Sequence, residues 1–332
     1  MNVYVVGAGA VGTYLGDLLS GIGNKVTYAP RSLDDVVPVD ADIALVTVKT
    51  YDTRSAIETL RRALRDPSRT TIVTPQNGIG NEEAFAAAFG AGAVVSAAMT
   101  VPVAMGPNGR GVAASGGGIA FAPVGTTNPN NWLLAMFGAA GLQTLAVRDF
   151  RSLKWSKLAL NIVANATCAI LDVLPERIVR EDDIFALEIR AIREVRSTMK
   201  ALGIPAIDLP RYPVRALLAV ATMPTPIART VLAGRIASAR GEKPPSLLLD
   251  LRSAKHRTEV EALNGAVARA AREAGLDAPV NAAFGRILSD VAHMPQLWAK
   301  YRERPAALVA EVRSETGRKP SGSHEAKGED NA

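Results

Sequence analysis

The chain has 332 residues, of which 48% are hydrophobic and 21% charged, a composition typical of a globular protein too long for one hydrophobic core. No apolar run approaches the roughly 18 residues of a membrane-spanning helix, and the first residues lack the basic region of a secretory signal. The one cysteine, Cys168, excludes an internal disulfide and suits a reducing cytoplasm, which is the location we expect.

The net charge of +6 comes from the second half of the chain. Residues 1–150 hold 10 Lys/Arg against 11 Asp/Glu, whereas residues 151–332 hold 28 against 21. A basic half can indicate nucleic-acid binding, but here the arginines are spread along amphipathic helices with few aromatic residues between them. A solvated basic surface, or attraction of a small anionic substrate, explains the charge without a nucleic-acid or membrane partner.

Short apolar strands alternate with helical stretches along the first 90 residues. We expect strands in NVYVV, KVTYAP, DIALVTVK and TTIVT, and helices in AVGTYLGDLLSGIG, DTRSAIETLRRALR and NEEAFAAAFG. This alternation predicts an α/β domain with a doubly wound parallel sheet of the Rossmann type. After residue 93, the glycine-punctuated strands in AVVSAAMTVPVAMG, GVAASGG and GIAFAPVG are expected to be antiparallel additions.

The hydrophobic period becomes helical from about residue 150, which predicts an all-α C-terminal domain. We expect a Rossmann-type domain over residues 1–150 and a helical substrate domain over 151–312. The polar, Gly/Ser-rich stretch 313–332 is expected to be a disordered tail. The helices are predicted at 151–171, 176–202, 211–221, 225–239, 246–274 and 279–293.

Three glycines form a G-x-G-x-x-G motif directly after the first expected strand and before the first expected helix. The first glycine allows a tight turn, the second lets the backbone approach a pyrophosphate, and the third permits close packing of helix on strand. The helix N-terminus then presents free N–H groups to phosphate. The alternative is a turn that is only close-packed. The predicted dinucleotide-binding turn consists of Gly7, Ala8, Gly9, Ala10, Val11 and Gly12.

The end of the second strand bears on the choice of dinucleotide. NAD-binding proteins carry Asp or Glu there, whereas an arginine can hold the 2′-phosphate of NADP. Here Arg31 follows the strand, and no acidic residue comes before Asp34. Because a guanidinium suits a phosphate dianion, we predict NADP (NADPH) as cofactor, with Arg31 in contact with it. The alternative is a surface arginine, with Asp34 or Asp35 facing the ribose.

Polar residues follow two further strands, where ligands bind in such sheets. Lys49 ends the strand in VTVKTYDT, and Gln76-Asn77-Gly78 follows the strand in TTIVTPQNG. Each segment could also be an ordinary strand-end turn.

The stretch LKWSKLALNIVANA places polar groups on one face of an expected helix. Lys157, Asn161 and Asn165 are spaced i, i+4 and i+8, among apolar residues that favour a core. Burial of such groups without partners is costly, so this face is either solvated or part of a site.

These motifs together resemble the ketopantoate reductases (2-dehydropantoate 2-reductases). The resemblance rests on GAGAVG, VKTYDT, PQNGIGNEE, KWSKLALNIVANA, PPSLLLDL and RTEVEALNGAV, in the family's order, over roughly residues 1–293. The first motif is generic, whereas the middle and late ones together are specific. Members of that family reduce ketopantoate to pantoate with NADPH, on the route to pantothenate and coenzyme A. Their active site lies between a Rossmann domain and an all-helical domain.

The resemblance implies roles for the polar residues. Lys157 matches the catalytic lysine that protonates the carbonyl oxygen, and Glu259 matches the glutamate that completes the catalytic site. The other matches are Asn161, Asn165 and Ser246, which bind substrate, and Lys49 and Asn77, which contact the cofactor and border the substrate.

The sequence departs from the family pattern at two places. Only about ten residues, 32–41, connect Arg31 to the third strand, which is near the minimum for a parallel crossover and leaves little room for a helix. The stretch between Asp250 and Glu259 is one residue longer than usual, which within a helix would rotate Glu259 by about 100°. Both changes bear on the cofactor and substrate sites.

The sequence therefore predicts an NADPH-dependent reductase of a small 2-oxo acid, with 2-dehydropantoate as substrate. The alternatives are reduction of another small 2-oxo acid on the same fold, or a non-catalytic NADP-binding regulator. No group of Asp, Glu, His or Cys has metal-ligand spacing, and hydride transfer from NADPH needs no metal. A homodimer is compatible with the sequence, although no heptad or patch specifies one.

Overall fold

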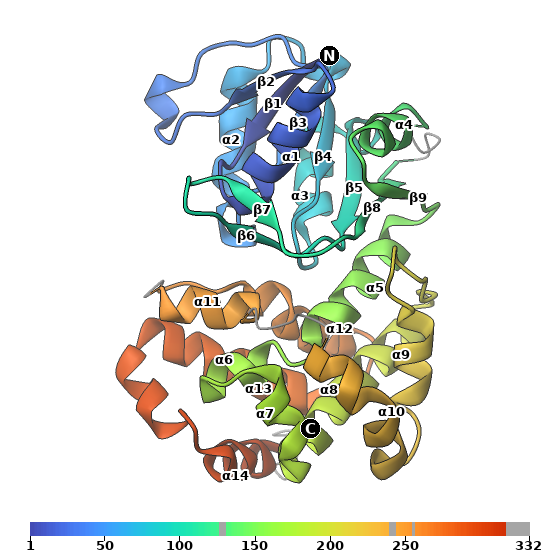
Figure 1. Cartoon of the computed structure of the whole chain (residues 1–332), viewed down its shortest axis with the longest axis vertical. Coiled ribbons are helices and arrows are strands. Elements are labelled where there is room, and N and C mark those ends of the chain that lie inside the picture. Colours follow the sequence, from blue (N-terminus) through green and yellow to red (C-terminus); the bar gives the residue numbers. More distant parts are fainter. Residues whose placement is uncertain (126–130, 239–243, 254–255, 317–332) are drawn as a thin grey trace, which may run out of the picture.

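The computed structural model describes residues 1–125, 131–238, 244–253 and 256–316. Figure 1 shows an N-terminal α/β domain joined to a helical C-terminal domain through α5 (Phe150–Ile162). No helix among the described residues is long and apolar enough to cross a membrane.

A seven-stranded sheet of order β2-β1-β3-β4-β5-β8-β9 forms the N-terminal domain. The first five strands are mutually parallel, β8 runs antiparallel to β5, and β9 runs parallel to β8. The parallel-dominated sheet confirms the predicted fold class. The strands are β1 (Asn2–Val6), β2 (Lys25–Tyr28), β3 (Ile43–Val46), β4 (Thr71–Thr74), β5 (Val94–Met99), β8 (Gly118–Pro123) and β9 (Gln143–Ala146).

Helices cover both faces of this sheet, which explains why the inner strands are apolar throughout. Along β1, Val3 and Val5 pack into one apolar core, and Tyr4 and Val6 into another. The first core includes residues of α1 and α4, and the second includes residues of α2 and α3. These helices are α1 (Ala10–Gly21), α2 (Thr53–Ala63), α3 (Asn81–Phe89) and α4 (Asn131–Ala139).

Strand β5, at the start of AVVSAAMTVPVAMG, runs parallel to β4, so the expectation that it is an antiparallel addition was wrong. Helix α3 returns the chain across the sheet between β4 and β5, and such a crossover produces parallel pairing. The later strands do run antiparallel, β8 against β5 and β6 (Val103–Met105) against β7 (Gly111–Ala113). The β6–β7 hairpin is a separate two-stranded sheet that packs on α1.

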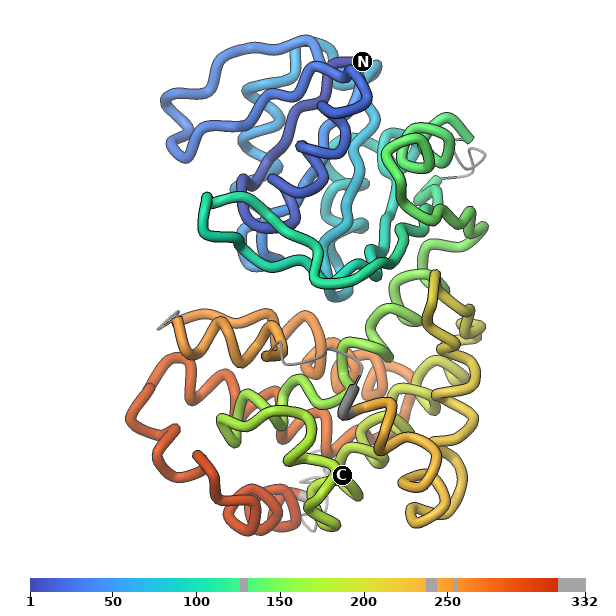
Figure 2. Tube along the Cα trace, viewed as in Figure 1, coloured from blue at the N-terminus to red at the C-terminus, as the bar shows by residue number. Residues whose placement is uncertain are grey.

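The connection between β2 and β3 contains one 3₁₀ turn, η1 (Leu33–Asp35), in place of a crossover helix. Figure 2 shows this connection as an open blue loop at the side of the sheet. Its end is held by the Val39 amide, which donates to the Ala63 carbonyl at 2.7 Å. The prediction that no helix fits between Arg31 and the third strand is confirmed.

The rest of the chain is helical, as predicted, but three of the expected long helices are interrupted. The segment 151–171 divides into α5 and α6, 176–202 into α7 and α8, and 246–274 into α11, a 3₁₀ turn and α12. Helix α14 continues to Thr316, so residues 313–316 of the expected tail are helical, and residues 317–332 lie outside the described residues. The helices after α5 are α6 (Ala166–Leu171), α7 (Pro175–Arg180), α8 (Asp182–Ala201), α9 (Val214–Val220), α10 (Thr225–Ser238), α11 (Ser246–Arg252), α12 (Asn264–Glu273), α13 (Pro279–His293) and α14 (Pro305–Thr316).

Candidate active site

The glycine turn after β1 has the geometry of a diphosphate cradle. Gly7 has φ +110°, and a Cβ there would lie 2.8 Å from the Val48 amide nitrogen. A Cβ at Gly12 would lie 2.0 Å from the Gly7 carbonyl oxygen, so helix and turn are in close contact. A Cβ at Gly9, by contrast, would have nothing within 4 Å, which leaves open space at the start of α1. The predicted residues therefore fit a dinucleotide's phosphates.

The segment that would face the adenosine ribose is exposed. Arg31 lies beyond the end of β2 with its side chain in solvent. Ser32 Oγ accepts a hydrogen bond from the Asp34 amide at 3.2 Å and so starts the turn η1. The Asp34 carboxylate lies 3.8 Å from the Arg62 guanidinium. Arg31, Asp34 and Asp35 are thus all on one short loop, and both predicted modes of ribose recognition remain available to it.

Lys49 joins the two domains at the carboxyl end of β3. Its Nζ lies 2.9 Å from Asp250 Oδ2 on α11 and 2.9 Å from Glu259 Oε2. Both carboxylate side chains are 5% exposed. Burial by itself lowers the pKa of Lys49, but the charges of Glu259 and Asp250 outweigh it and hold the pKa above its usual value. Lys49 therefore keeps its proton between these two acidic side chains.

The longer segment before Glu259 does not lie within one helix. Helix α11 ends at Arg252, and Glu259 begins a separate 3₁₀ turn, η5 (Glu259–Ala262). Because no continuous helix links Asp250 to Glu259, the extra residue imposes no rotation on the carboxylate. Glu259 Oε1 accepts from the Thr50 amide at 3.1 Å and lies 3.3 Å from Thr50 Oγ1.

Asn77 and Asn161 form the second contact between the domains. Asn161 Nδ2 on α5 donates to Asn77 Oδ1 at 3.0 Å. The Asn77 carbonyl accepts from Thr50 Oγ1 at 2.9 Å and from Asn81 Nδ2 at 3.0 Å, which holds the turn after β4. Both Asn77 and Asn161 were predicted site residues, and the structure places them in direct contact.

The predicted polar face of a single helix is divided by a break after Ile162. Ala164 has φ +48°, and Asn165 caps the next helix, α6. The break is held by the buried Glu188 carboxylate, which accepts from the Ala164 amide at 2.8 Å and from the Thr167 hydroxyl. The i+8 spacing of Asn165 therefore does not place it on the helical face of Lys157.

The break turns Asn165 toward α11. Its Oδ1 accepts from the Leu247 amide at 3.2 Å, and its Nδ2 lies 3.5 Å from Ser246 Oγ. The predicted substrate-binding pair Asn165 and Ser246 is thus brought together, by a route that helical spacing did not indicate. Lys157 lies half-buried on α5, about one turn before Asn161.

These contacts, together with helix α11, which carries both Asp250 and Ser246, link a series of polar residues across the domain junction, which we call the polar arc. Six of its eight members were predicted from the sequence. Two were missed: Thr50, and Asp250, whose i+4 spacing from Ser246 on α11 could have indicated it. In order, the polar arc runs Asn161, Asn77, Thr50, Glu259, Lys49, Asp250, Ser246 and Asn165.

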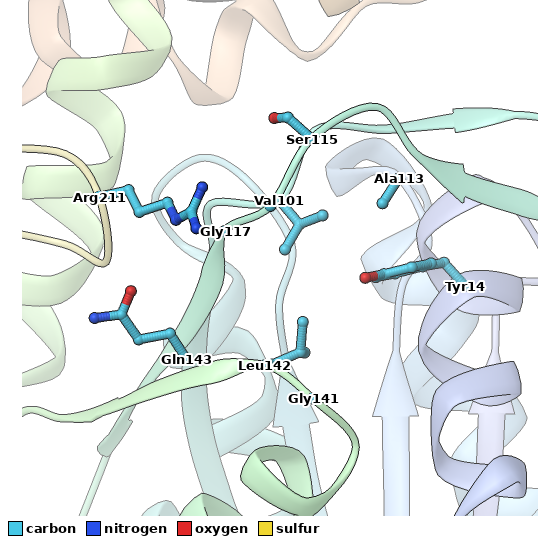
Figure 3. Close-up of a pocket in the computed structure, with 10 residues that line it drawn as sticks. Tyr14, Val101, Ala113, Ser115, Gly117, Gly141, Leu142, Gln143 and Arg211 are labelled. Atoms are coloured by element: carbon cyan, nitrogen blue, oxygen red, sulfur yellow. The ribbon is translucent and has the colours of Figure 1, made fainter.

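A separate cavity of about 340 Å³ lies beside β9, and it contains none of the predicted site residues. Figure 3 shows Arg211, from the helical domain, extending toward Gly117 on its rim. No group of three or more His, Cys, Asp or Glu residues that could hold a metal ion occurs in the part of the chain that the structure describes.

Two family models match the chain. Residues 23–125 match the model described as "Ketopantoate reductase PanE/ApbA", and residues 149–292 match its "C terminal" counterpart. The 2-dehydropantoate 2-reductase of Pyrococcus horikoshii is 26% identical over 85% of this chain and 94% of its own length. That of Archaeoglobus fulgidus is 27% identical over 84% of this chain and 94% of its own length.

Solved structures share the fold. A PanE/ApbA family ketopantoate reductase from Ralstonia eutropha aligns with a TM-score of 0.73 at 24% identity, covering 89% of this chain and 100% of its own. D-mandelate dehydrogenase in complex with NADH aligns with a TM-score of 0.73 at 16% identity, covering 88% of this chain and 99% of its own. At these identities the structures support the fold alone.

Proposed function

The chain belongs to the ketopantoate reductase family, a family of oxidoreductases, and we propose that it reduces the ketone of 2-dehydropantoate to pantoate with NADPH. This activity would supply pantothenate and coenzyme A biosynthesis. The observation that carries the proposal is the polar arc, which gathers side chains from both domains beside the glycine turn. Its members offer the donors and charges that a small 2-oxo acid requires.

We assign the proton transfer to Lys157. When bound, the dinucleotide would supply a hydride to the ketone carbon, and negative charge would develop on the carbonyl oxygen. An ammonium within hydrogen-bond reach of that oxygen stabilises the charge and delivers the proton that completes the alcohol. Lys157 suits this role because it lies half-buried on the same helix as Asn161, whose amide is already in the polar arc.

The neutral donors of the polar arc orient the substrate. Asn161, Asn165 and Ser246 can donate hydrogen bonds to the carboxylate and hydroxyl oxygens without adding charge. Correct orientation of the ketone face toward the hydride contributes a large part of the acceleration of the chemical step. Glu259 completes the site by fixing Lys49 and the Thr50 amide, and thereby the strand end that borders the cofactor.

The cofactor would lie along the carboxyl ends of β1, β2 and β3. The turn from Gly7 to Gly12 would hold the diphosphate, and Arg31 would hold the 2′-phosphate of NADP. Lys49 and Asn77 would contact the cofactor and border the substrate. We further propose the domain boundary at residues 150/151 and a homodimer in solution. The ketopantoate reductase of Staphylococcus aureus, a structural neighbour with a TM-score of 0.66, is described as dimeric.

The test is the oxidation of NADPH by the full chain with ketopantoate and with a panel of other small 2-oxo acids, repeated with NADH. We expect the highest kcat/KM for ketopantoate with NADPH, and complete loss of turnover in Lys157→Ala. A higher kcat/KM for another 2-oxo acid would mean that this chain catalyses the same type of ketone reduction on a different substrate. Wild-type kcat in Lys157→Ala would refute the assignment of the proton donor, and tight NADPH binding without any turnover would indicate a regulator.

A further inference from the structure

A buried ion pair lies directly behind the polar arc, where α5 meets the sheet. Lys154 Nζ on α5 is 3.0 Å from Glu82 Oε1 on α3, and the two side chains are 3% and 1% exposed. Each residue comes from a different domain, so the pair spans the domain junction. The ion pair is absent from the predicted site, and no spacing in the sequence connects the two residues.

The N-terminal domain holds Glu82 rigidly. Its Oε1 accepts hydrogen bonds from Thr74 Oγ1 at 2.9 Å and from Ser96 Oγ at 3.0 Å, on the neighbouring strands β4 and β5. A buried pair of charges costs desolvation and is weak evidence for added stability, whereas it does impose one geometry on the groups that it joins. The carboxylate is therefore a fixed anchor point for the ammonium of Lys154.

Lys154 also reaches the turn that contains Asn77. Its Nζ donates a hydrogen bond to the carbonyl of Gln76, the residue directly before Asn77. Three residues before Lys157 and seven before Asn161, Lys154 shares their helical face. Lys154 and Asn161, both on this helical face, therefore each donate a hydrogen bond to the turn after β4. Lys157 lies between these two residues on α5.

We propose that Lys154 and Glu82 are positioning residues, which set the distance between Lys157 and the hydride-accepting carbon by locking α5 to the turn at Gln76-Asn77. This inference rests on the proposed function, because it takes Lys157 as the proton donor. Both side chains are almost fully buried, which leaves them little surface for direct contact with a ligand. Their effect is exerted through Gln76 and through the helix axis.

The test compares the double variant Lys154→Met/Glu82→Gln with wild type, as full chains, in single-turnover oxidation of NADPH with ketopantoate as the hydride acceptor. The double variant removes both charges, so that no unpaired charge is left buried. We expect the rate constant to fall by about 10- to 100-fold, because small displacements of reacting groups have effects of that size, while the amplitude and the Kd for NADPH change by less than about 3-fold. Arg151→Ala, an exposed residue at the start of the same helix, is the matched control and should keep the wild-type rate constant.

The single-turnover rate constant separates positioning from a merely structural role. A structural role would lower the amplitude, as the folded fraction falls, and leave the rate constant within about 2-fold of wild type; that result would overturn the proposal. If the double variant does not fold, the single variant Lys154→Arg is compared with wild type in the same assay instead. It keeps the charge but alters the contact with Gln76, so an unchanged rate constant in that variant would also overturn the proposal.

A second measurement does not depend on turnover. Amide hydrogen exchange of residues 76–79 should be at least about 10-fold faster in the double variant than in wild type, because local opening frees that turn. Unchanged exchange would overturn the proposal even if the wild type reduces no 2-oxo acid. Conversely, exchange could be faster in the double variant while the wild type reduces no 2-oxo acid. That combination would refute the proposed function but support the inference that Lys154 and Glu82 anchor the turn.

Discussion

Lys49 and Glu259 are 210 residues apart in the sequence, and yet Nζ of the one lies 2.9 Å from Oε2 of the other. The contact links the end of β3 to the start of η5, and so the N-terminal domain to the helical domain. Asp250 lies at the same distance from the ammonium, on a different element of the helical domain. One lysine therefore organises two separate segments of the second domain.

Replacement of Lys49 by methionine should lower the free energy of unfolding by roughly 1–3 kcal/mol, because Asp250 and Glu259 then face each other as buried like charges. The expected loss of stability is smaller than for removal of one partner of a fully buried ion pair, since 31% of the Lys49 side chain is exposed. Urea unfolding measures the difference. Lys25→Met, an exposed lysine on β2, is the control and should change stability by less than about 0.5 kcal/mol.

The difference in the free energy of unfolding between wild type and Lys49→Met should depend on pH in a defined direction. Burial lowers the pKa of Lys49, but Glu259 and Asp250 raise it above its usual value in the folded state. A raised folded-state pKa means that the stabilisation is complete below the ordinary lysine pKa of about 10.4 and is lost as the pH rises through the folded value. As the pH rises from neutrality, the difference between wild type and Lys49→Met should stay constant and shrink only in strong alkali. A difference that shrinks as the pH rises just above neutrality would contradict this account.

The glycine turn allows binding to be separated from folding. Gly9→Ala places a methyl group in open space at φ −81°, so the free energy of unfolding should change by less than about 1 kcal/mol. Its Kd for NADPH should rise at least about 10-fold, because the methyl group occupies the approach of the phosphates. Gly12→Ala is the counterpart: its Cβ would lie 2.0 Å from the Gly7 carbonyl, and stability should fall by about 1–3 kcal/mol. Equal NADPH affinity in wild type and Gly9→Ala would mean that phosphates do not bind here.

Arg31 should determine the preference between the two dinucleotides. Loss of a charge-assisted hydrogen bond to the 2′-phosphate in Arg31→Ala should raise the Kd for NADPH by about 10- to 100-fold. The Kd for NADH should stay within about 3-fold, because NADH lacks that phosphate. Titration of both dinucleotides by fluorescence measures both constants. If Asp34→Ala instead weakened NADH binding and Arg31→Ala had no effect, the loop would recognise the ribose hydroxyls.

Ser246 should affect substrate binding more than the chemical step. Ser246→Ala removes a hydroxyl that lies 3.5 Å from Asn165 Nδ2, and KM for the 2-oxo acid should rise by about 3- to 30-fold with kcat within about 2-fold. Ser253→Ala, an exposed serine just beyond the end of α11, is the matched control and should leave both constants unchanged. A fall in kcat without a change in KM would instead place Ser246 in the chemical step.

The order of strands and helices in the first domain could be predicted because local patterns carry it. Continuous apolar runs such as Val3 to Val6 indicate strands buried on both faces, and the glycine turn after β1 has a steric explanation at each position. The short connection between β2 and β3 follows from counting residues. These features depend on neighbours along the chain, so no knowledge of the other domain is needed.

The breaks in the helical domain could not be predicted in the same way. Leu158 and Ile162, on one side of the break, and Ala166 and Ile170, on the other, are as apolar as a continuous helix would require. The chain turns between them where Glu188, on α8, accepts hydrogen bonds from the Ala164 amide within the break and from the Thr167 hydroxyl just after it. Such a partner is distant in sequence and leaves no trace in the local hydrophobic period.

The resemblance of the sequence motifs supplied candidate site residues without reference to their surroundings, namely Lys157, Asn161, Asn165, Ser246 and Glu259. The way in which they are held depends on the packing of the two domains. That packing brought Asp250 to Lys49, turned Asn165 toward α11, and paired Lys154 with Glu82 behind the site. The physical reason is that a charge or amide in the sequence has many potential partners, and tertiary packing selects among them by excluding water around the pairs that form.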